Sequence, residues 1–122
     1  MTYSEDDWRK AITRLIQMTS NGELSWAEYP DFKADAWTEV DRAFACKLKD
    51  KKYVVAAIRT RHYVDEEEFF WVNGVAFAVY KAGFADLFIG EAPRTLSVLD
   101  SLLSVVTDSF VFSQNALGDL LD

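Results

Sequence analysis

The first forty residues open with the spacing of an amphipathic helix. One stripe recurs at i, i+4, i+7, i+8 and i+11, made of Trp8, Ile12, Leu15, Ile16 and Thr19. Ser4 followed three residues later by Asp7 forms a capping-box pattern, and Gly22 suits a left-handed C-terminal cap. The pattern therefore predicts a helix that begins after Ser4 and ends before Gly22.

A second helical pattern lies near the other end of the chain. Its apolar positions are Leu96, Leu99, Leu102, Leu103, Val106 and Phe110. Pro93 is typical of the first turn of a helix, so we expect this helix to open there. The following stretch, residues 111–122, predicts a short helical tail.

The middle of the chain alternates apolar and polar residues with the period of two that marks β-strands. Residues 24–29 predict a strand with Leu24, Trp26 and Glu28 on one face, and the acidic loop after it is expected to anchor Phe32 and Trp37 in the core. Residues 42–49 predict a second strand. Three side chains of that strand are expected to point inward: Phe44, Cys46 and Leu48.

Residues 53–64 begin with apolar side chains on both faces, as expected of a strand at the centre of a sheet. Three further strands are predicted at 68–72, 75–83 and 84–91. Asn73-Gly74 is a strong type I′ hairpin signal between the first two of these. The whole chain, residues 1–122, is expected to form one α+β domain: an N-terminal helix, an antiparallel meander of four to six strands, and a C-terminal helix with a short helical tail.

Composition fits a globular protein: half of the 122 residues are apolar and 15% are aromatic. The single cysteine, Cys46, cannot form an internal disulfide, and a reducing compartment fits best. The N-terminus is acidic and has no apolar stretch typical of a signal peptide, and no apolar run approaches the ~20 residues of a membrane span. We therefore expect a cytoplasmic protein without a membrane segment.

The net charge of −7 is unevenly distributed. Residues 42–61 carry seven basic groups and one acid, whereas residues 95–122 contain four aspartates and no lysine or arginine. An acidic molecule repels nucleic acid at long range, so the aromatic residues that interleave with the basic ribbon more simply reflect a solvated strand face. A basic protein partner, or a homodimer with complementary charge, is expected instead.

The stretch "RTRHYVDEEEFF", residues 59–70, concentrates the candidate chemistry. It contains Arg59, Arg61, Tyr63 and the only histidine, His62, before the four consecutive acids Asp65, Glu66, Glu67 and Glu68. Strand alternation places His62 on the face opposite the two arginines and Tyr63. The simplest interpretation is the solvated end of a β-hairpin, and the functional interpretation is an acidic lip that docks onto a basic partner, with these residues except His62 as the contact set.

Catalytic and metal-binding patterns are missing from the sequence. Four adjacent acids lack the alternating ligand spacing of a hard-cation loop, and a transition-metal site needs more histidine or cysteine than this chain has. A Cys46–His62 pair is conceivable in the core but has no evident orienting group. We therefore expect no metal site, no cofactor, no catalytic residue and no enzymatic activity.

The stretch "LIQMTSNGELSW", residues 15–26, is a helix end that runs through T-x-x-G-x-L-x-W into a strand. It resembles the opening of small uncharacterised α+β proteins of bacteria, phages and mobile elements. The resemblance covers these residues alone and transfers no catalytic residue. It implies an accessory protein, a group that includes inhibitors of host defence systems and immunity proteins that neutralise toxins.

The favoured hypothesis is a small acidic, non-enzymatic protein-binding module. In its more specific form, the module is carried by a phage or mobile element and inhibits a host defence complex. One alternative is a toxin-neutralising immunity protein. Another is a small-molecule-binding domain with a cup between the sheet and the C-terminal helix. The expected lining of that cup is Phe77, Phe84, Phe88 and Trp71.

Overall fold

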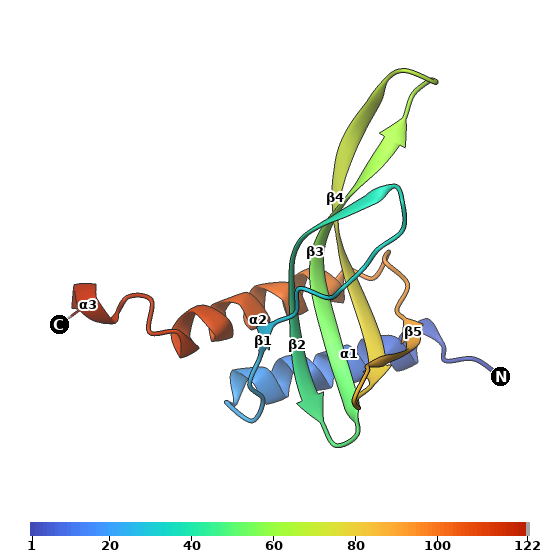
Figure 1. Ribbon diagram of the computed structural model, residues 1–122. Coiled ribbons are helices and arrows are strands. Elements are labelled where there is room, and N and C mark those ends of the chain that lie inside the picture. Colours follow the sequence, from blue (N-terminus) through green and yellow to red (C-terminus); the bar gives the residue numbers. More distant parts are fainter. Residues whose placement is uncertain (122) are drawn as a thin grey trace.

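A computed structural model describes residues 1–121 and contains three helices and one five-stranded antiparallel sheet (Figure 1). The elements in chain order are α1 (Glu5–Ser20), β1 (Ala27–Glu28), β2 (Thr38–Leu48), β3 (Lys51–Tyr63), β4 (Phe69–Lys81), β5 (Leu87–Glu91), α2 (Val98–Ser113) and α3 (Gly118–Leu121). The strands lie in the sheet in sequence order, so every connection joins neighbours. This arrangement confirms the predicted α+β meander between terminal helices.

Helix α1 begins and ends where its local sequence predicts. The Asp7 backbone N–H donates to the Ser4 hydroxyl at 3.1 Å, and the Ser4 N–H donates to the Asp7 carboxylate at 2.9 Å. These two bonds complete the capping box and satisfy donors that the first turn leaves free. At the other end Gly22 has a φ of +75°, a conformation that glycine adopts without steric cost.

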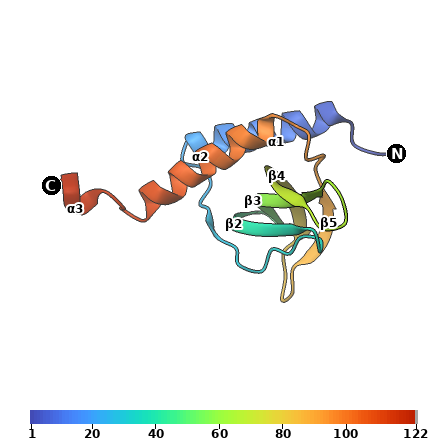
Figure 2. The ribbon, with the colours of Figure 1, turned by 90° about the horizontal axis from the view of Figure 1, so that it is seen from above.

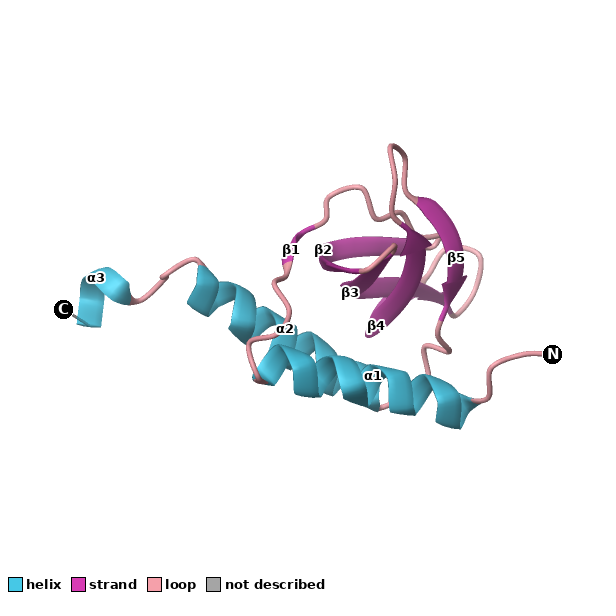
Figure 3. Cartoon of the chain, turned by 90° about the horizontal axis from the view of Figure 1, so that it is seen from below, coloured by secondary structure: helices cyan, strands magenta, loops and turns pink. Residues whose placement is uncertain are grey.

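Both long helices lie on the same face of the sheet (Figures 2 and 3). Helix α2 packs on β3 and β4, and α1 lies beside α2. The core between the layers contains the inward side of the sheet and the stripes of both helices, including Phe44, Val55, Phe77, Ile12 and Leu102. Their burial confirms the predicted apolar stripes. None of the helices in residues 1–121 has both the length and the apolar composition required to cross a bilayer.

The opposite face of the sheet is covered by the chain itself. The β1–β2 connection, residues 29–37, crosses this face and inserts Phe32, which is 7% exposed (Figure 1). Most of the sheet residues beneath it are small: Ala43, Ala45, Ala56, Ala76 and Ala78. Small side chains let an irregular segment approach the strands closely. Because both faces are covered here, β3 is buried on two sides and lies at the centre of the sheet, as predicted.

Two predicted strand boundaries in the first half of the chain are wrong. The strand expected over 24–29 is reduced to Ala27–Glu28, although Leu24 and Trp26 are buried in the core. Strand β2 begins at Thr38 rather than residue 42, because the end of the acidic loop pairs with the far half of β3. That pairing carries Trp37 away from the core, and its side chain is 58% exposed.

Asn73-Gly74 does not form a turn. Strand β4 runs without interruption from Phe69 to Lys81, and Gly74 pairs with Ile58 of β3. Thirteen consecutive residue pairs hold β3 against β4, and this long register prevails over a local two-residue preference. The last two predicted strands become the end of β4 and the shorter β5, which begins at Leu87.

Helix α2 begins at Val98, five residues after the predicted start at Pro93. The intervening residues form successive turns, in which the Leu96 N–H donates to the Pro93 carbonyl oxygen and the Leu99 N–H to that of Leu96. These turns bury Leu96 before the helix begins. The predicted helical tail is present as α3.

Candidate interaction surface: the distal hairpin

Strands β3 and β4 continue well beyond the helices as an arm, which β2 joins only at its base, where Thr38 pairs with Thr60 (Figure 1). We define this arm, residues 59–73, as the distal hairpin. Its strands pair in regular register, with Arg61 opposite Trp71, His62 opposite Phe70 and Tyr63 opposite Phe69. A strand of thirteen residues is about 43 Å long, whereas two adjacent helices cover only about 20 Å, so the far end of the strands extends past the helical layer.

The distal hairpin exposes large apolar side chains on both faces. Residues directly opposite each other in an antiparallel pair share a face, so Tyr63, Phe69 and Trp71 lie on one side, and Phe70 and Val72 on the other. All of them are at least 36% exposed, and Phe70 reaches 54%. A contiguous exposed apolar surface of this kind is typical of a site of protein association.

The two arginines of the distal hairpin stack on its aromatic rings. The Arg59 guanidinium lies 5.0 Å from the Trp71 ring centre, and that of Arg61 lies 5.2 Å from Trp71 and 5.5 Å from Phe69. Arg59 also forms ion pairs with Glu39 at 2.9 Å and Asp41 at 3.2 Å. Arg61 has no ion pair within residues 1–121, and the Nε atoms of both arginines are buried without a hydrogen-bond partner. Arg59 therefore ties the hairpin to β2, whereas the Arg61 charge is free.

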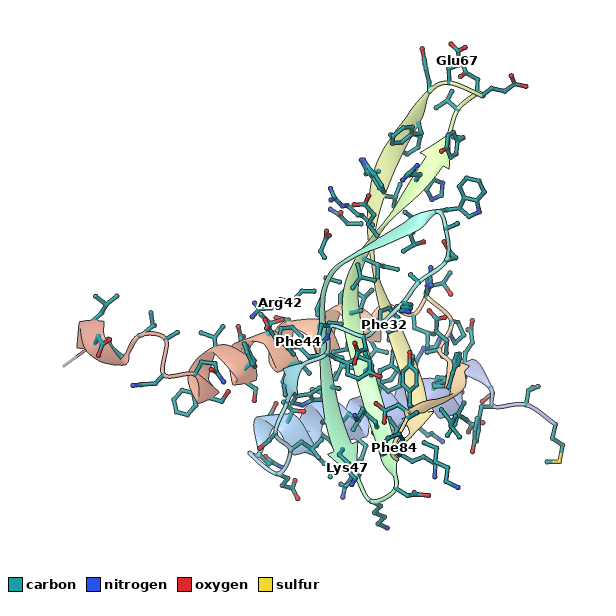
Figure 4. All side chains as sticks on the ribbon, viewed as in Figure 1. Phe32, Arg42, Phe44, Lys47, Glu67 and Phe84 are labelled. Carbon is teal, nitrogen blue, oxygen red and sulfur yellow. The ribbon has the colours of Figure 1, made fainter. Side chains whose placement is uncertain are left out.

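The four consecutive acids form the tip of the hairpin, as the sequence predicted; Figure 4 shows Glu67 there. We call residues 65–68 the acidic turn. The carboxylate of Asp65 accepts hydrogen bonds from the backbone N–H groups of Glu67 at 2.8 Å and Glu68 at 2.9 Å. These donors hold the pKa of Asp65 below its ordinary value. In the described part of the chain, none of the four carboxylates forms an ion pair, so the turn presents an uncompensated negative charge.

Trp37 joins the distal hairpin from outside it. The backbone N–H of Arg61 donates a hydrogen bond to the backbone carbonyl oxygen of Trp37 at 2.9 Å. This bond brings the Trp37 indole beside Tyr63. The two rings meet edge to face, with centres 5.8 Å apart and planes at 85°. Together with Asp65 and Glu66 they line an open hollow of about 580 Å³, which we call the notch. Sequence reasoning missed Trp37 as a surface residue, and its only signal was the acidic stretch around it.

Cys46 and His62 do not meet. Cys46 lies opposite Tyr53 in the core, and His62 lies nine positions further along β3, about 30 Å away. Burial raises the pKa of the Cys46 thiol to about 12, which suppresses the reactive thiolate. His62 stacks on Phe70 in the distal hairpin. Residues 1–121 contain no group of three or more histidine, cysteine or acidic side chains able to hold a metal ion.

The four residues expected to line a small-molecule cup are scattered. Phe77 is buried under the helices, Trp71 lies in the distal hairpin, and Phe84 and Phe88 are exposed near β5. Figure 4 places Phe84 toward the end of the sheet opposite Glu67. A groove of about 860 Å³ lies instead between α1 and the sheet, bordered by Trp8, Tyr53, Phe77 and Val79 among others.

The basic ribbon of residues 42–61 is largely neutralised by ion pairs. Four of its seven basic side chains contact carboxylates: Arg42, Lys51, Lys52 and Arg59. The closest partly buried pair is Lys52 with Asp86 at 2.8 Å. Phe44 is buried and Tyr53 stacks on Phe77 in the core, so neither offers a free ring to a base. Within the ribbon, these two rings are therefore not available for stacking on a nucleic-acid base.

Comparisons with known proteins provide no relative from which a function could be transferred. No family model, no curated protein and no solved structure matches the chain. The functional conclusion must therefore come from the surface itself, where the distal hairpin combines exposed aromatic rings with unpaired charge.

Proposed function

We propose that this chain is a non-enzymatic protein-binding module that captures a basic protein partner through its distal hairpin. The observation that supports the proposal is the hairpin itself: it extends beyond the helices, exposes large apolar side chains on both faces and ends in four carboxylates without ion pairs. A two-stranded hairpin is only marginally stable in water on its own. Its exposed aromatic surface gains stability when a partner covers it.

The apolar part of the surface is large enough to contribute most of the binding energy. Tyr63, Phe69, Phe70 and Trp71 are adjacent on the two strands and are each more than a third exposed. Burial of a fully exposed side chain of this size contributes about 1.5–3 kcal/mol, and burial of the remaining exposed half contributes roughly half of that. Aromatic residues of this kind, with arginine, are also the side chains that most often dominate measured interface energies.

The charges select the partner. The acidic turn and the net charge of −7 attract a positively charged surface and repel nucleic acid. Arg61, in the strand part of the distal hairpin, can form an ion pair with a carboxylate of the partner, whereas Arg59 already forms ion pairs with Glu39 and Asp41. Tyr63 and the acidic turn therefore form the contact set with Arg61, and Arg59 supports it from within.

An inhibitor of a host defence complex, carried by a phage or mobile element, is the form of this function that we favour. A toxin-neutralising immunity protein would use the same surface, because many nucleic-acid-directed enzymes present basic faces. A homodimer would instead pair the basic ribbon of residues 42–61 with the acidic, lysine-free C-terminal segment of a second copy. Light scattering of the purified protein separates the dimer from a monomer that awaits another partner.

The test is partner capture from a lysate of the native host with tagged wild-type protein and two charge-reversed variants. The first variant changes Glu66, Glu67 and Glu68 to lysine. The matched control reverses three exposed acids away from the hairpin, Glu23, Asp31 and Asp108, which changes the net charge equally. We expect the first variant to lose capture by about tenfold or more, with its thermal unfolding unchanged. Equal capture by both variants would remove the acidic turn from the proposed interface.

A further inference from the structure

We infer that the notch binds the guanidinium group of an arginine side chain presented by the partner protein. The inference rests on the proposed function, and it adds the chemistry of one specific contact. The notch lies where the paired strands of the distal hairpin meet the acidic turn. It is lined by Trp37, Tyr63, Asp65 and Glu66. These residues come from the β1–β2 connection and from the hairpin, so only the folded chain brings them together.

The two aromatic rings contact each other edge to face, and they leave outer faces open to a flat cation. Their planes stand at 85° to each other, and the side chains of Trp37 and Tyr63 are 58% and 46% exposed. The faces of aromatic rings carry negative electrostatic potential and attract a cation within about 6 Å of the ring centre. No arginine or lysine of residues 1–121 lies over either ring.

The carboxylates complete the cation site. Oδ1 of Asp65 accepts hydrogen bonds from the backbone N–H groups of Glu67 and Glu68, and Oδ2 has no hydrogen bond within the described residues. Glu66 forms neither an ion pair nor a side-chain hydrogen bond in that same range. The unused oxygens at the edge of the notch can therefore accept hydrogen bonds from a cation stacked on an open ring face in the notch.

The same hairpin already shows how arginine occupies its aromatic surface. Arg61 lies over Trp71 and Phe69, and Arg59 lies over Trp71 while it pairs with Glu39 and Asp41. This combination of ring face and carboxylate is what the notch offers to a group from outside. A planar guanidinium both stacks on rings and binds carboxylates through two parallel hydrogen bonds, which an ammonium group cannot do equally.

The test uses small probes that do not require the partner. Protein labelled with ¹⁵N is titrated with n-butylguanidinium, with the neutral isostere n-butylurea and with n-butylammonium, while the indole N–H signals of all four tryptophans are followed. We expect a saturable shift at Trp37 with n-butylguanidinium, with an affinity about fivefold above that for n-butylurea. The indole signals of the other three tryptophans serve as controls. Trp8 and Trp26 belong to the core, and the ring of Trp71 already has an arginine over it.

Two variants with matched charge locate the site. Glu66→Gln is expected to weaken binding of n-butylguanidinium by about two- to fivefold, whereas Glu23→Gln, an exposed acid outside the hairpin, leaves it unchanged. Trp37→Leu is expected to abolish saturation, followed through the backbone amides of the acidic turn. Equal affinities for n-butylguanidinium and n-butylurea, or equal effects of the two glutamate variants, would overturn the inference; stronger binding of n-butylammonium would overturn the choice of arginine.

The outcome separates this site from the wider proposal. If n-butylguanidinium does not bind but charge reversal of the acidic turn still abolishes partner capture, the arginine site is wrong and the docking function stands. If n-butylguanidinium binds at Trp37 but charge reversal leaves capture unchanged, the site exists and the proposed docking function is wrong.

Discussion

The same two strands, β3 and β4, are core at one end and surface at the other. In the proximal part, Val54, Ala56 and Ala76 are fully buried. In the distal hairpin, Phe70 is 54% exposed although it is more apolar than any of the alanines. The difference shows that a covering layer, rather than the hydrophobicity of the strand, decides whether a side chain is buried.

Side-chain size accompanies this division. Beneath the β1–β2 connection the sheet is lined mainly by alanine, which lets Phe32 and its neighbours lie close to the strands. Beyond that point the strands carry phenylalanine, tyrosine and tryptophan, and apart from Trp37 against Tyr63 no segment of residues 1–121 covers them. The chain thus uses small residues where it packs on itself and large ones where it is open to a partner.

The largest expected effect contrasts two phenylalanines of β4. Phe77→Ala leaves a cavity under the helices, and we expect it to lower the free energy of unfolding by about 3–5 kcal/mol. Phe70→Ala, seven residues away in the bare part of the strand, should change it by less than about 1 kcal/mol. Urea denaturation measures both, and equal losses would show that the distal hairpin is packed in solution.

Cysteine reactivity offers the next comparison. Because burial raises the pKa of Cys46 to about 12, its thiolate fraction at pH 8 is about a thousandfold below that of an ordinary thiol. A cysteine placed at exposed Val64, in a Cys46→Ala background, should therefore react about a thousandfold faster with a disulfide reagent. Cys46 should react only after unfolding or as the pH approaches 12, and rapid labelling at pH 8 would contradict its burial.

A buried hydrogen bond should produce a smaller loss. The Thr19 hydroxyl donates to the Leu15 carbonyl oxygen at 2.7 Å and accepts from the Trp26 indole N–H at 2.9 Å. Thr19→Val leaves that indole without a partner, and we expect a loss of about 1–3 kcal/mol in unfolding free energy. Thr107→Val is the control, since Thr107 donates to the Leu103 carbonyl oxygen but receives no side-chain bond in the described chain. Similar losses in thermal unfolding would refute the role of Trp26.

The smallest effect lies at the junction between the two regions. Gly74 is in mid-strand, and a Cβ there would make only ordinary contacts, the nearest with Ile58 at 3.7 Å. Gly74→Ala should therefore raise the free energy of unfolding by about 0.4–1 kcal/mol through the entropy of the unfolded chain. Gly22→Ala, at a φ of +75°, should instead lower it. A destabilised Gly74→Ala would restore the interpretation of Asn73-Gly74 as a turn.

The capping residues of α1 and the alternation of β3 were reliable signals, whereas the local signals at Asn73-Gly74 and Pro93 were overridden by longer-range packing. The ends of α1 lie within a few residues of the positions that Ser4, Asp7 and Gly22 predict. The alternation of β3 places Arg61 and His62 on opposite faces. The start of β2 was not predictable, because Thr38 becomes strand only by pairing with Thr60, twenty-two residues away. Trp37 was misplaced for the same reason, since its exposure follows from that pairing.

The sequence by itself determined the order of elements, the meander and the acidic turn at residues 65–68. The hydrophobic period, the helix caps and the runs of charge each involve only a few neighbouring residues, so they can be recognised in the sequence alone. Only the tertiary structure decided which aromatic residues stay bare and which four residues form the notch. That outcome depends on how far the helices and the β1–β2 connection extend over strands about 43 Å long. The relative lengths of these layers are set in the folded molecule, and no local sequence pattern predicts them.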